Sequence, residues 1–143
     1  PTQWLGYSFH HMRFGGSITA TSDTHISVIT ETVGCLITAG FSRVLILNGH
    51  GGNEADMAVA LQKIKEVHED TPVFAASHWR LVAPQLDAIK QAGPRGSGHA
   101  GEMETSMMLV IRPDLVKAER PIMLEAIVDG LVDVVHDIQS GQL

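Results

Sequence analysis

The sequence has only one cysteine, Cys35, among its 143 residues. A single thiol cannot form an intramolecular disulfide, which excludes the small secreted domains that disulfides hold together. A reducing compartment suits such a chain, and we expect the protein in the cytoplasm. Cys35 stands beside Leu36 on a predicted helix. We therefore interpret it as a small buried hydrophobe rather than a nucleophile.

Clustered basic residues and long apolar runs are also missing. Ten Lys and Arg are scattered among 16 Asp and Glu, and the net charge is -6. Nucleic-acid binding needs basic residues gathered on one face, so we expect no nucleic-acid partner. No apolar run reaches the roughly 18 residues of a membrane span, so we expect no membrane partner. A hydrophobic content of 44% suits one globular domain over residues 1–143.

The first half of the chain alternates helical and extended patterns. Thr21 and Ser22 are N-cap candidates for a helix that Gly40 ends. A continuous apolar run at 43–47 is typical of a strand buried on both faces. A second helix has its apolar face at Met57, Ala60, Leu61, Ile64 and Val67, and 72–77 is the next strand. Helix, strand, helix, strand with short connections predicts parallel strands in an α/β layered fold.

The second half is predicted to be mainly helical. A short helix is expected near 83–91, a glycine-rich loop at 93–101, a helix at 102–111 and an amphipathic helix at 121–139. Four methionines read as core filler, namely Met12, Met103, Met107 and Met108. Three histidines fall on helix positions that we expect to be solvated, namely His25, His68 and His136.

The first strand is followed by a turn, LNGHGGN at 47–53, which places His50 at the strand's C-terminal end. Ligands of open α/β sheets bind at these ends. Three glycines permit positive φ and close backbone approach, so the imidazole can reach a metal, a phosphate or a substrate. The turn matches neither GxGxxG nor GxxxxGK[ST], which disfavours nucleotide binding. At this point a ligand or catalytic His50 and a purely structural turn are equally good interpretations.

A second dense stretch, GSGHAGEMETS at 96–106, brings His99 close in sequence to Glu102 and Glu104. His99 and Glu104 can converge if the loop folds back. The two glutamates diverge by about 200° on a helix, so one at most faces the same centre as His99. Glu102 suits charge compensation at the helix N-terminus. Glu104 enters an apolar run, where a carboxylate needs a partner such as Zn²⁺, Mn²⁺ or Fe²⁺.

These two stretches together resemble the creatininase family of amidohydrolases. The resemblance extends to PTQWLGYSFHHMRFGGSIT at 1–19 and to LEAIVDGLVDVV at 124–135. It implies a three-layer αβα sandwich with a mostly parallel sheet and a centre of two divalent ions, Zn, Mn or Fe. It also implies a homo-oligomer, with a hexamer as the family's usual state.

The resemblance assigns roles residue by residue. His50 matches a metal ligand, and Glu104 matches a ligand of the second metal, with Glu102 as the alternative. His99 matches a histidine that moves a proton or contacts substrate. Substrate-binding residues are expected at Trp79, His11, Gly51, Gly52 and Asn53.

This sequence departs from the family pattern in three places. The family's upstream Glu, His and Asp ligands precede the position of Pro1, and the link near 120–122 is short. We therefore expect a domain that is incomplete at the N-terminus, lacks a loop near 120–122, and binds metal weakly by itself. Gly52 stands where creatininase itself carries an acid, which favours the wider family of formamide hydrolases and a peptide-trimming enzyme over creatinine hydrolysis.

In its complete form the protein is predicted to be a metal-dependent hydrolase of a non-peptide C–N bond in a small-molecule amide, cyclic amide or formamide. The alternative is a catalytically silent family remnant that serves as an assembly or interaction module. Phosphate binding at the glycine turn is a third interpretation and needs no metal. Four aromatic residues fall in a glycine-interrupted segment and support oligomerisation, namely Trp4, Tyr7, Phe9 and Phe14.

Overall fold

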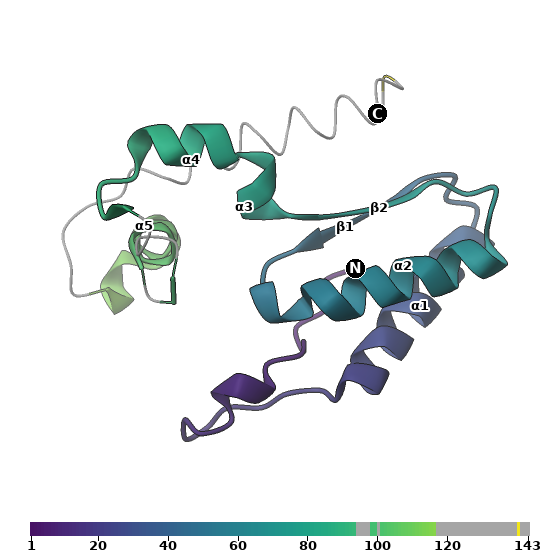
Figure 1. Ribbon diagram of the computed structural model, residues 1–143, viewed down its shortest axis with the longest axis horizontal. Coiled ribbons are helices and arrows are strands. Elements are labelled where there is room, and N and C mark those ends of the chain that lie inside the picture. The colour runs from purple at the N-terminus through teal and green to yellow at the C-terminus, as the bar shows by residue number, and fades with distance from the viewer. Residues whose placement is uncertain (94–97, 100, 117–139, 141–143) are drawn as a thin grey trace. The chain divides into compact units, whose positions relative to one another are not determined.

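The computed structural model describes residues 1–93, 98–99, 101–116 and 140 (Figure 1). The chain divides into two compact units, Pro1–Ser77 and His78–Leu143. The predicted helix at 121–139 and the short link near 120–122 lie outside the described residues. Among the helices that are described, none combines the length and apolar character needed to span a membrane.

The first unit contains two long helices and two strands, in the order predicted. Its elements are η1 (Phe9–His11), α1 (Ser22–Thr38), β1 (Val44–Asn48), η2 (Gly51–Asn53), α2 (Glu54–Val67) and β2 (Val73–Ser77). The strands β1 and β2 pair in parallel, with Val44 opposite Val73 and Asn48 opposite Ser77. The predicted parallel pair joined by a crossover helix is thus confirmed.

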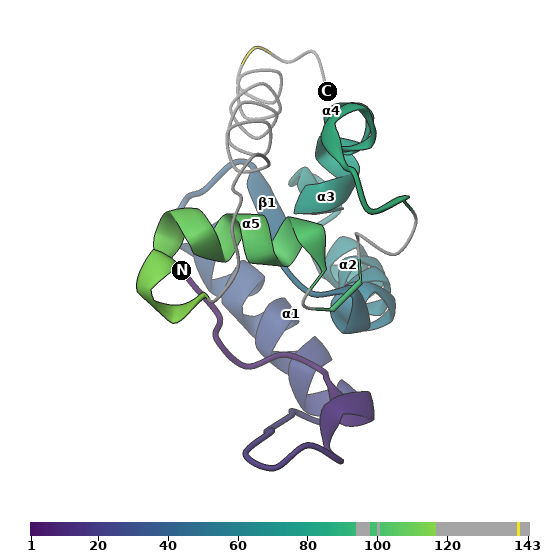
Figure 2. The ribbon, with the colours of Figure 1, turned by 90° about the vertical axis from the view of Figure 1, so that its left-hand side faces the viewer.

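The core of this unit lies between the two helices and one face of the sheet (Figures 1 and 2). Ile26, Ile29 and Val33 of α1 meet the fully buried Ala60 of α2 and Val44 of β1. Because side chains alternate along a strand, Leu45, Leu47, Phe74 and Ala76 belong to the opposite face. Leu47 is 47% exposed. A second helical layer against this apolar face, as the three-layer sandwich requires, stays a prediction.

The ends of α1 follow the capping signals in the sequence. The side-chain oxygen of Thr21 accepts a hydrogen bond from the backbone N–H of Thr24 at 3.3 Å. Gly40, two residues past the last helical residue, has a φ of 95°. This left-handed conformation suits glycine and explains why the helix ends there.

Two predictions on α1 are wrong. His25 is buried, with 3% exposed, because it lies four residues before Ile29 and so faces α2 with the apolar residues. Cys35 is exposed, because it stands two positions from Val33 and therefore points about 200° away from the buried face. The apolar residues next to His25 and Cys35 in the sequence did not indicate on which side of the helix either residue lies.

His25 takes part in a buried polar contact between α1 and α2. Its Nδ1 lies 2.9 Å from Oδ2 of Asp56, which is itself 5% exposed. The hydroxyl of Ser22 donates to the other carboxylate oxygen, Oδ1. Both oxygens of Asp56 therefore have partners, which is what a buried carboxylate requires.

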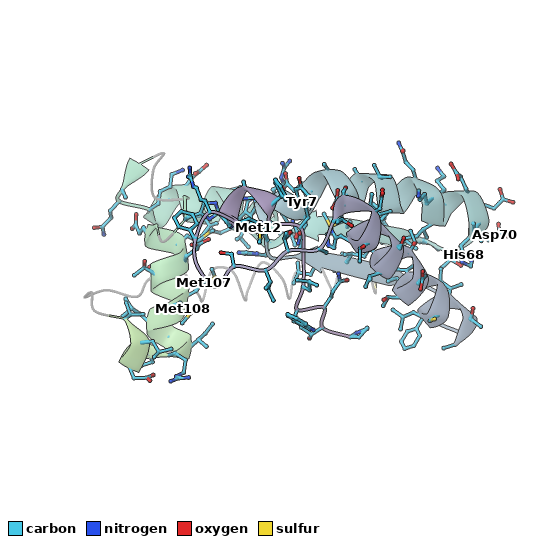
Figure 3. All side chains as sticks on the ribbon, turned by 90° about the horizontal axis from the view of Figure 1, so that it is seen from below. Tyr7, Met12, His68, Asp70, Met107 and Met108 are labelled. Atoms are coloured by element: carbon cyan, nitrogen blue, oxygen red, sulfur yellow. The ribbon has the colours of Figure 1, made fainter. Side chains whose placement is uncertain are left out.

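The second unit contains short helices around a separate apolar cluster. Its described elements are α3 (His78–Leu81), α4 (Ala83–Ile89), α5 (Glu102–Ile111) and η4 (Pro113–Leu115). Val82, Leu86 and Met103 are buried together, and Met107 packs against them. Met103 and Met107 are core residues as predicted. Met12 and Met108 are exposed, so the prediction is wrong for them (Figure 3).

Replacing Asp56 with alanine should destabilise the fold. The buried His25 loses its acceptor, and an unsatisfied buried polar group costs about 1–3 kcal/mol. Ser22 is half-buried, so its loss of an acceptor should cost less. Urea denaturation should show the loss as a lower midpoint. Asp70→Ala, at an exposed position, is the matched control and should change the free energy of unfolding by no more than about 0.5 kcal/mol. Equal midpoints for the two variants would contradict this account of the buried contact.

Candidate metal centre

The turn after β1 is held by the side chain of Asn48, which is 4% exposed. Its Nδ2 donates to the carbonyl of His50 at 2.8 Å and to Oγ of Ser77 at 3.0 Å. Its Oδ1 accepts from the backbone N–H of His50 at 3.1 Å and from Nδ2 of Asn53 at 3.1 Å. One side chain therefore fixes both backbone groups of His50. The sequence analysis missed this role, because an asparagine before glycine reads only as a turn residue.

Asn53 joins this turn to the N-terminal segment. Its Oδ1 accepts from the backbone N–H of Tyr7 at 2.9 Å. A Cβ on Gly6 would lie 2.6 Å from the same oxygen, so the approach requires glycine there. The amide of Asn53 is thus engaged at both ends within the protein. Its observed role is to position residues 6–7, and its contact with substrate stays a prediction.

Gly52 has a steric role at the imidazole of His50. A Cβ at position 52 would lie 2.6 Å from His50 Nε2 and 2.6 Å from the carbonyl oxygen of Tyr7. The carbonyl belongs to the backbone and cannot swing aside. The glycines with positive φ are elsewhere in the described chain, at 16, 40 and 93. Close approach, and not an unusual backbone conformation, is therefore the reason for glycine at position 52.

Three histidines gather at this turn. His10, His11 and His50 each offer a ring nitrogen, and these atoms all lie within 4.8 Å of one another. The His50 ring centroid is 5.6 Å from that of His10, with the rings parallel to within 7°, and 5.7 Å from that of His11. We expected the segment of His11 to approach the site, and it lies beside His50. His10 was not singled out, because its distance from His50 in the sequence conceals their proximity.

The histidine rings adjoin a cleft of about 960 Å³ in the first unit. Its walls come from β1, from α1 and from residues 1–6, and His11, His50 and Asn53 also line it. Pockets for small molecules have volumes of about 300–1,000 Å³. The turn at the end of β1 therefore faces a space large enough for a small ligand.

In the second unit His99 and Glu104 lie near each other, as the sequence allowed. Nδ1 of His99 lies 4.0 Å from Oε1 of Glu104, and their side chains are 65% and 46% exposed. Glu102 points to a different task. Its carboxylate accepts from the backbone N–H of Gln91 at 2.9 and 3.0 Å and from that of Ala92 at 2.7 Å. This supports a structural role for Glu102, in which its carboxylate ties the end of α4 to the start of α5.

Trp79, expected at the substrate pocket, lies on α3. It packs against the cluster of Val82, Leu86 and Met103, and its ring meets His78 edge-on at 4.9 Å. Packing within the second unit accounts for its position. Its contact with substrate, like those of Gly51 and Gly52, stays a prediction.

The family model described as creatininase, creatinine amidohydrolase, matches residues 1–132. A 3-dehydro-scyllo-inosose hydrolase of Thermotoga maritima is 24% identical over 98% of this chain and 45% of its own length. A mycofactocin precursor peptide peptidase of Mycobacterium ulcerans is 29% identical over 80% of this chain and 40% of its own length. The chain thus spans less than half the length of the curated relatives it matches.

Solved creatininase structures have the same fold. A creatininase with Mn superimposes with a TM-score of 0.74 at 19% identity, covering 92% of this chain and 72% of the other. A mutant creatininase of Zn–Zn type superimposes with a TM-score of 0.73 over the same shares. This likeness confirms the predicted creatininase-like α/β fold. With the family model matching residues 1–132, the chain belongs to the creatininase family.

Proposed function

We propose that the complete protein is a metal-dependent hydrolase that cleaves the C–N bond of a small-molecule amide, cyclic amide or formamide. The observation that carries the proposal is the position of His50. Its backbone is held by Asn48 at the C-terminal end of β1, and its ring lines a cleft. A fixed imidazole at such an edge suits a metal ligand.

The donor set on this chain fits divalent ions. Imidazole nitrogen and carboxylate oxygen suit Zn²⁺, Mn²⁺ and Fe²⁺. His50 and Glu104 are the residues that we propose as ligands, in a centre of two ions. Glu102 is the weaker candidate, because its carboxylate oxygens already accept backbone hydrogen bonds. The similar creatininases with Mn and of Zn–Zn type support a divalent metal in the family.

Divalent ions, when bound, polarise a substrate carbonyl and make water a stronger nucleophile at neutral pH. The chain's own groups supply the rest of the chemistry. We assign His99 to the proton that must reach the leaving nitrogen, because amide cleavage expels a poor leaving group unless that nitrogen is protonated. Oε1 of Glu104 lies 4.0 Å from Nδ1 of His99, so the two side chains share one side of this loop-to-helix junction. Trp79 is proposed to pack on substrate.

We assign the substrate only to the class of small-molecule amides. The two curated relatives act on different substrates, one an inosose and the other a peptide by their names. Gly52 offers no side chain to a substrate, and a Cβ there would press on His50 and Tyr7. The acid that creatininase carries at this position has no counterpart here. Creatinine is therefore not the favoured substrate.

The phosphate-binding alternative is disfavoured by the turn's backbone. A phosphate cradle needs N–H groups that point at the ligand. Here the N–H of His50 donates to Asn48, and the N–H of Asn53 donates to the carbonyl of His50. The silent-remnant alternative has no observation in its favour.

Substitutions in the complete enzyme should separate metal ligands from the proton carrier. His50→Ala and Glu104→Gln should lose metal and activity together. His99→Ala should keep its metal and lose about 10²–10⁴-fold in kcat, the usual contribution of a general acid or base. Metal content is measured beside kcat, after creatinine, N-formyl amines and lactams have been screened for a substrate.

Glu102→Gln is the matched control for Glu104→Gln, since the two acids share the first turn of α5. It should keep its metal. If Glu102→Gln empties the site and Glu104→Gln leaves it loaded, the two glutamates have the opposite roles. If His50→Ala retains full metal content, the centre lies elsewhere and the proposed function loses its main support.

We also propose that the protein is a homo-oligomer, and the N-terminal aromatics support this. Trp4, Phe9 and Phe14 are 79%, 68% and 56% exposed. Exposed aromatics gathered in one segment mark protein interfaces. Light scattering at micromolar concentration should therefore give a mass above that of one chain. Phe9→Ser should weaken the assembly, and Phe41→Ser, at an exposed position outside this segment, should not. A monomeric parent protein would contradict the proposal.

A further inference from the structure

We propose that His10, His11 and His50 together form a three-imidazole site for one transition-metal ion, complete within residues 1–77. The inference rests on the metal-binding role proposed above for His50 and adds two ligands to it. It needs neither Glu104 nor any residue outside this chain. The site would therefore bind metal in this chain by itself. If His50 and Glu104 were the only ligands, the chain by itself would bind metal weakly.

The distances between the three ring nitrogens are slightly longer than those of ligands bound to one metal ion. Metal–nitrogen bonds of about 2.0–2.1 Å place two ligand atoms of one ion no more than about 4.2 Å apart. The three nitrogens here lie within 4.8 Å of one another. Two imidazoles on one tetrahedral ion have ring centroids about 5 Å apart. The His50 ring is 5.6 and 5.7 Å from the other two, and the His10 and His11 rings are 4.1 Å apart, so side chains must rotate to close the site.

Each ring approaches the site with support from the protein. His50 is fixed through Asn48, and the lack of a Cβ on Gly52 leaves room for its ring. His11 Nδ1 lies 2.6 Å from the hydroxyl of Ser8, whose own backbone N–H donates to Thr19 Oγ1 at 2.7 Å. When His11 binds a metal through Nε2, its Nδ1–H donates to this hydroxyl. Such an outer partner orients metal-binding histidines in known sites.

His10 supplies the open side of the site. It is exposed, whereas His11 and His50 are half-buried. A metal ion would therefore enter the site past His10. Three protein ligands with a further position open to water is the arrangement of catalytic zinc sites, and four closed ligands is that of structural ones. His10, His11 and His50, here called the trio, therefore form a site of the open, catalytic type.

The chemistry of the donors selects among metals. A set of three imidazoles suits Zn²⁺, Cu²⁺, Fe²⁺ and Ni²⁺, whereas Mn²⁺ and Mg²⁺ favour carboxylate and water oxygen. The trio should therefore bind Zn²⁺ more tightly than Mn²⁺. A centre that uses the Glu104 carboxylate accepts Mn²⁺ more readily, so the metal preference separates the two arrangements.

The test is a calorimetric titration of the 143-residue chain with Zn²⁺ and with Mn²⁺. We expect one Zn²⁺ per chain and much weaker binding of Mn²⁺. His10→Ala, His11→Ala and His50→Ala should each weaken Zn²⁺ binding by at least about 10-fold, since even outer-partner changes cost 10–100-fold. His68→Ala, which removes a half-buried histidine at the end of α2, is the matched control and should leave binding unchanged.

A second measurement guards against misfolded variants. Nitrogen-15 spectra of the histidine rings should show shifts on Zn²⁺ addition at His10, His11 and His50, with His68 and His99 unmoved. The proposal is overturned if the chain binds no Zn²⁺, or if His10→Ala and His11→Ala bind it as the parent does. Its failure is distinct from failure of the proposed function. A complete enzyme that needs His50 and Glu104 but neither His10 nor His11 refutes only the trio, whereas zinc on the trio without amide hydrolysis refutes only the enzyme.

Discussion

The side chain of Asn48 holds the candidate centre together, because it is the point where four segments of the first unit meet. It bonds to His50 of the turn, to Ser77 at the end of β2 and to Asn53, which in turn holds Tyr7. An amide side chain offers two N–H donors and two acceptor lone pairs, and here all four are used. A buried amide with every bond satisfied rigidifies its surroundings, whereas a partly satisfied one destabilises them. Ser77 extends the network by donating to Glu54 at 2.7 Å.

Two glycines let this network bring distant segments together. Gly6 lies against the amide of Asn53, and Gly52 lies against the ring of His50 and the carbonyl of Tyr7. In both places a Cβ would meet another atom at 2.6 Å. The N-terminal segment can therefore lie on the turn, and η1 carries His10 and His11 to His50. Without these close approaches the three rings would not share one region.

The sequence predicted the secondary structure well because hydrophobic periodicity and capping are local signals. Thr21, Gly40 and the run at 43–47 are read from neighbours along the chain, and the parallel pairing follows from a connection that contains a helix. His25 was misplaced because a histidine in an apolar stripe is buried only if an acid such as Asp56 meets it from another element. That meeting depends on tertiary structure. The same holds for the bond from Asn48 to Ser77 and for His10 beside His50, because these partners are far apart in the sequence.

The candidate site was predicted in part, and the rest depended on individual hydrogen bonds. The resemblance to creatininases indicated His50 and Glu104 but left Glu102 as an alternative. Spacing on a helix could show that the two acids diverge, but not which one the backbone of Gln91 and Ala92 would occupy. The sequence indicated that His99 and Glu104 can converge, and they lie 4.0 Å apart at one loop-to-helix junction. The assignment of His50 and Glu104 to one centre of two ions remains a prediction.

The proposed ligands differ in how firmly the protein holds them, and this difference bears on where metal affinity arises. His50 is fixed through backbone bonds to a buried amide, so little conformational entropy is left for it to lose on binding. Glu104 is 46% exposed, and its contact with His99 at 4.0 Å lies in solvent, where such pairs contribute little. A ligand that is already ordered contributes more net binding free energy than one that must be ordered by the ion. Metal affinity should therefore depend more on His50, which Asn48 holds, than on Glu104.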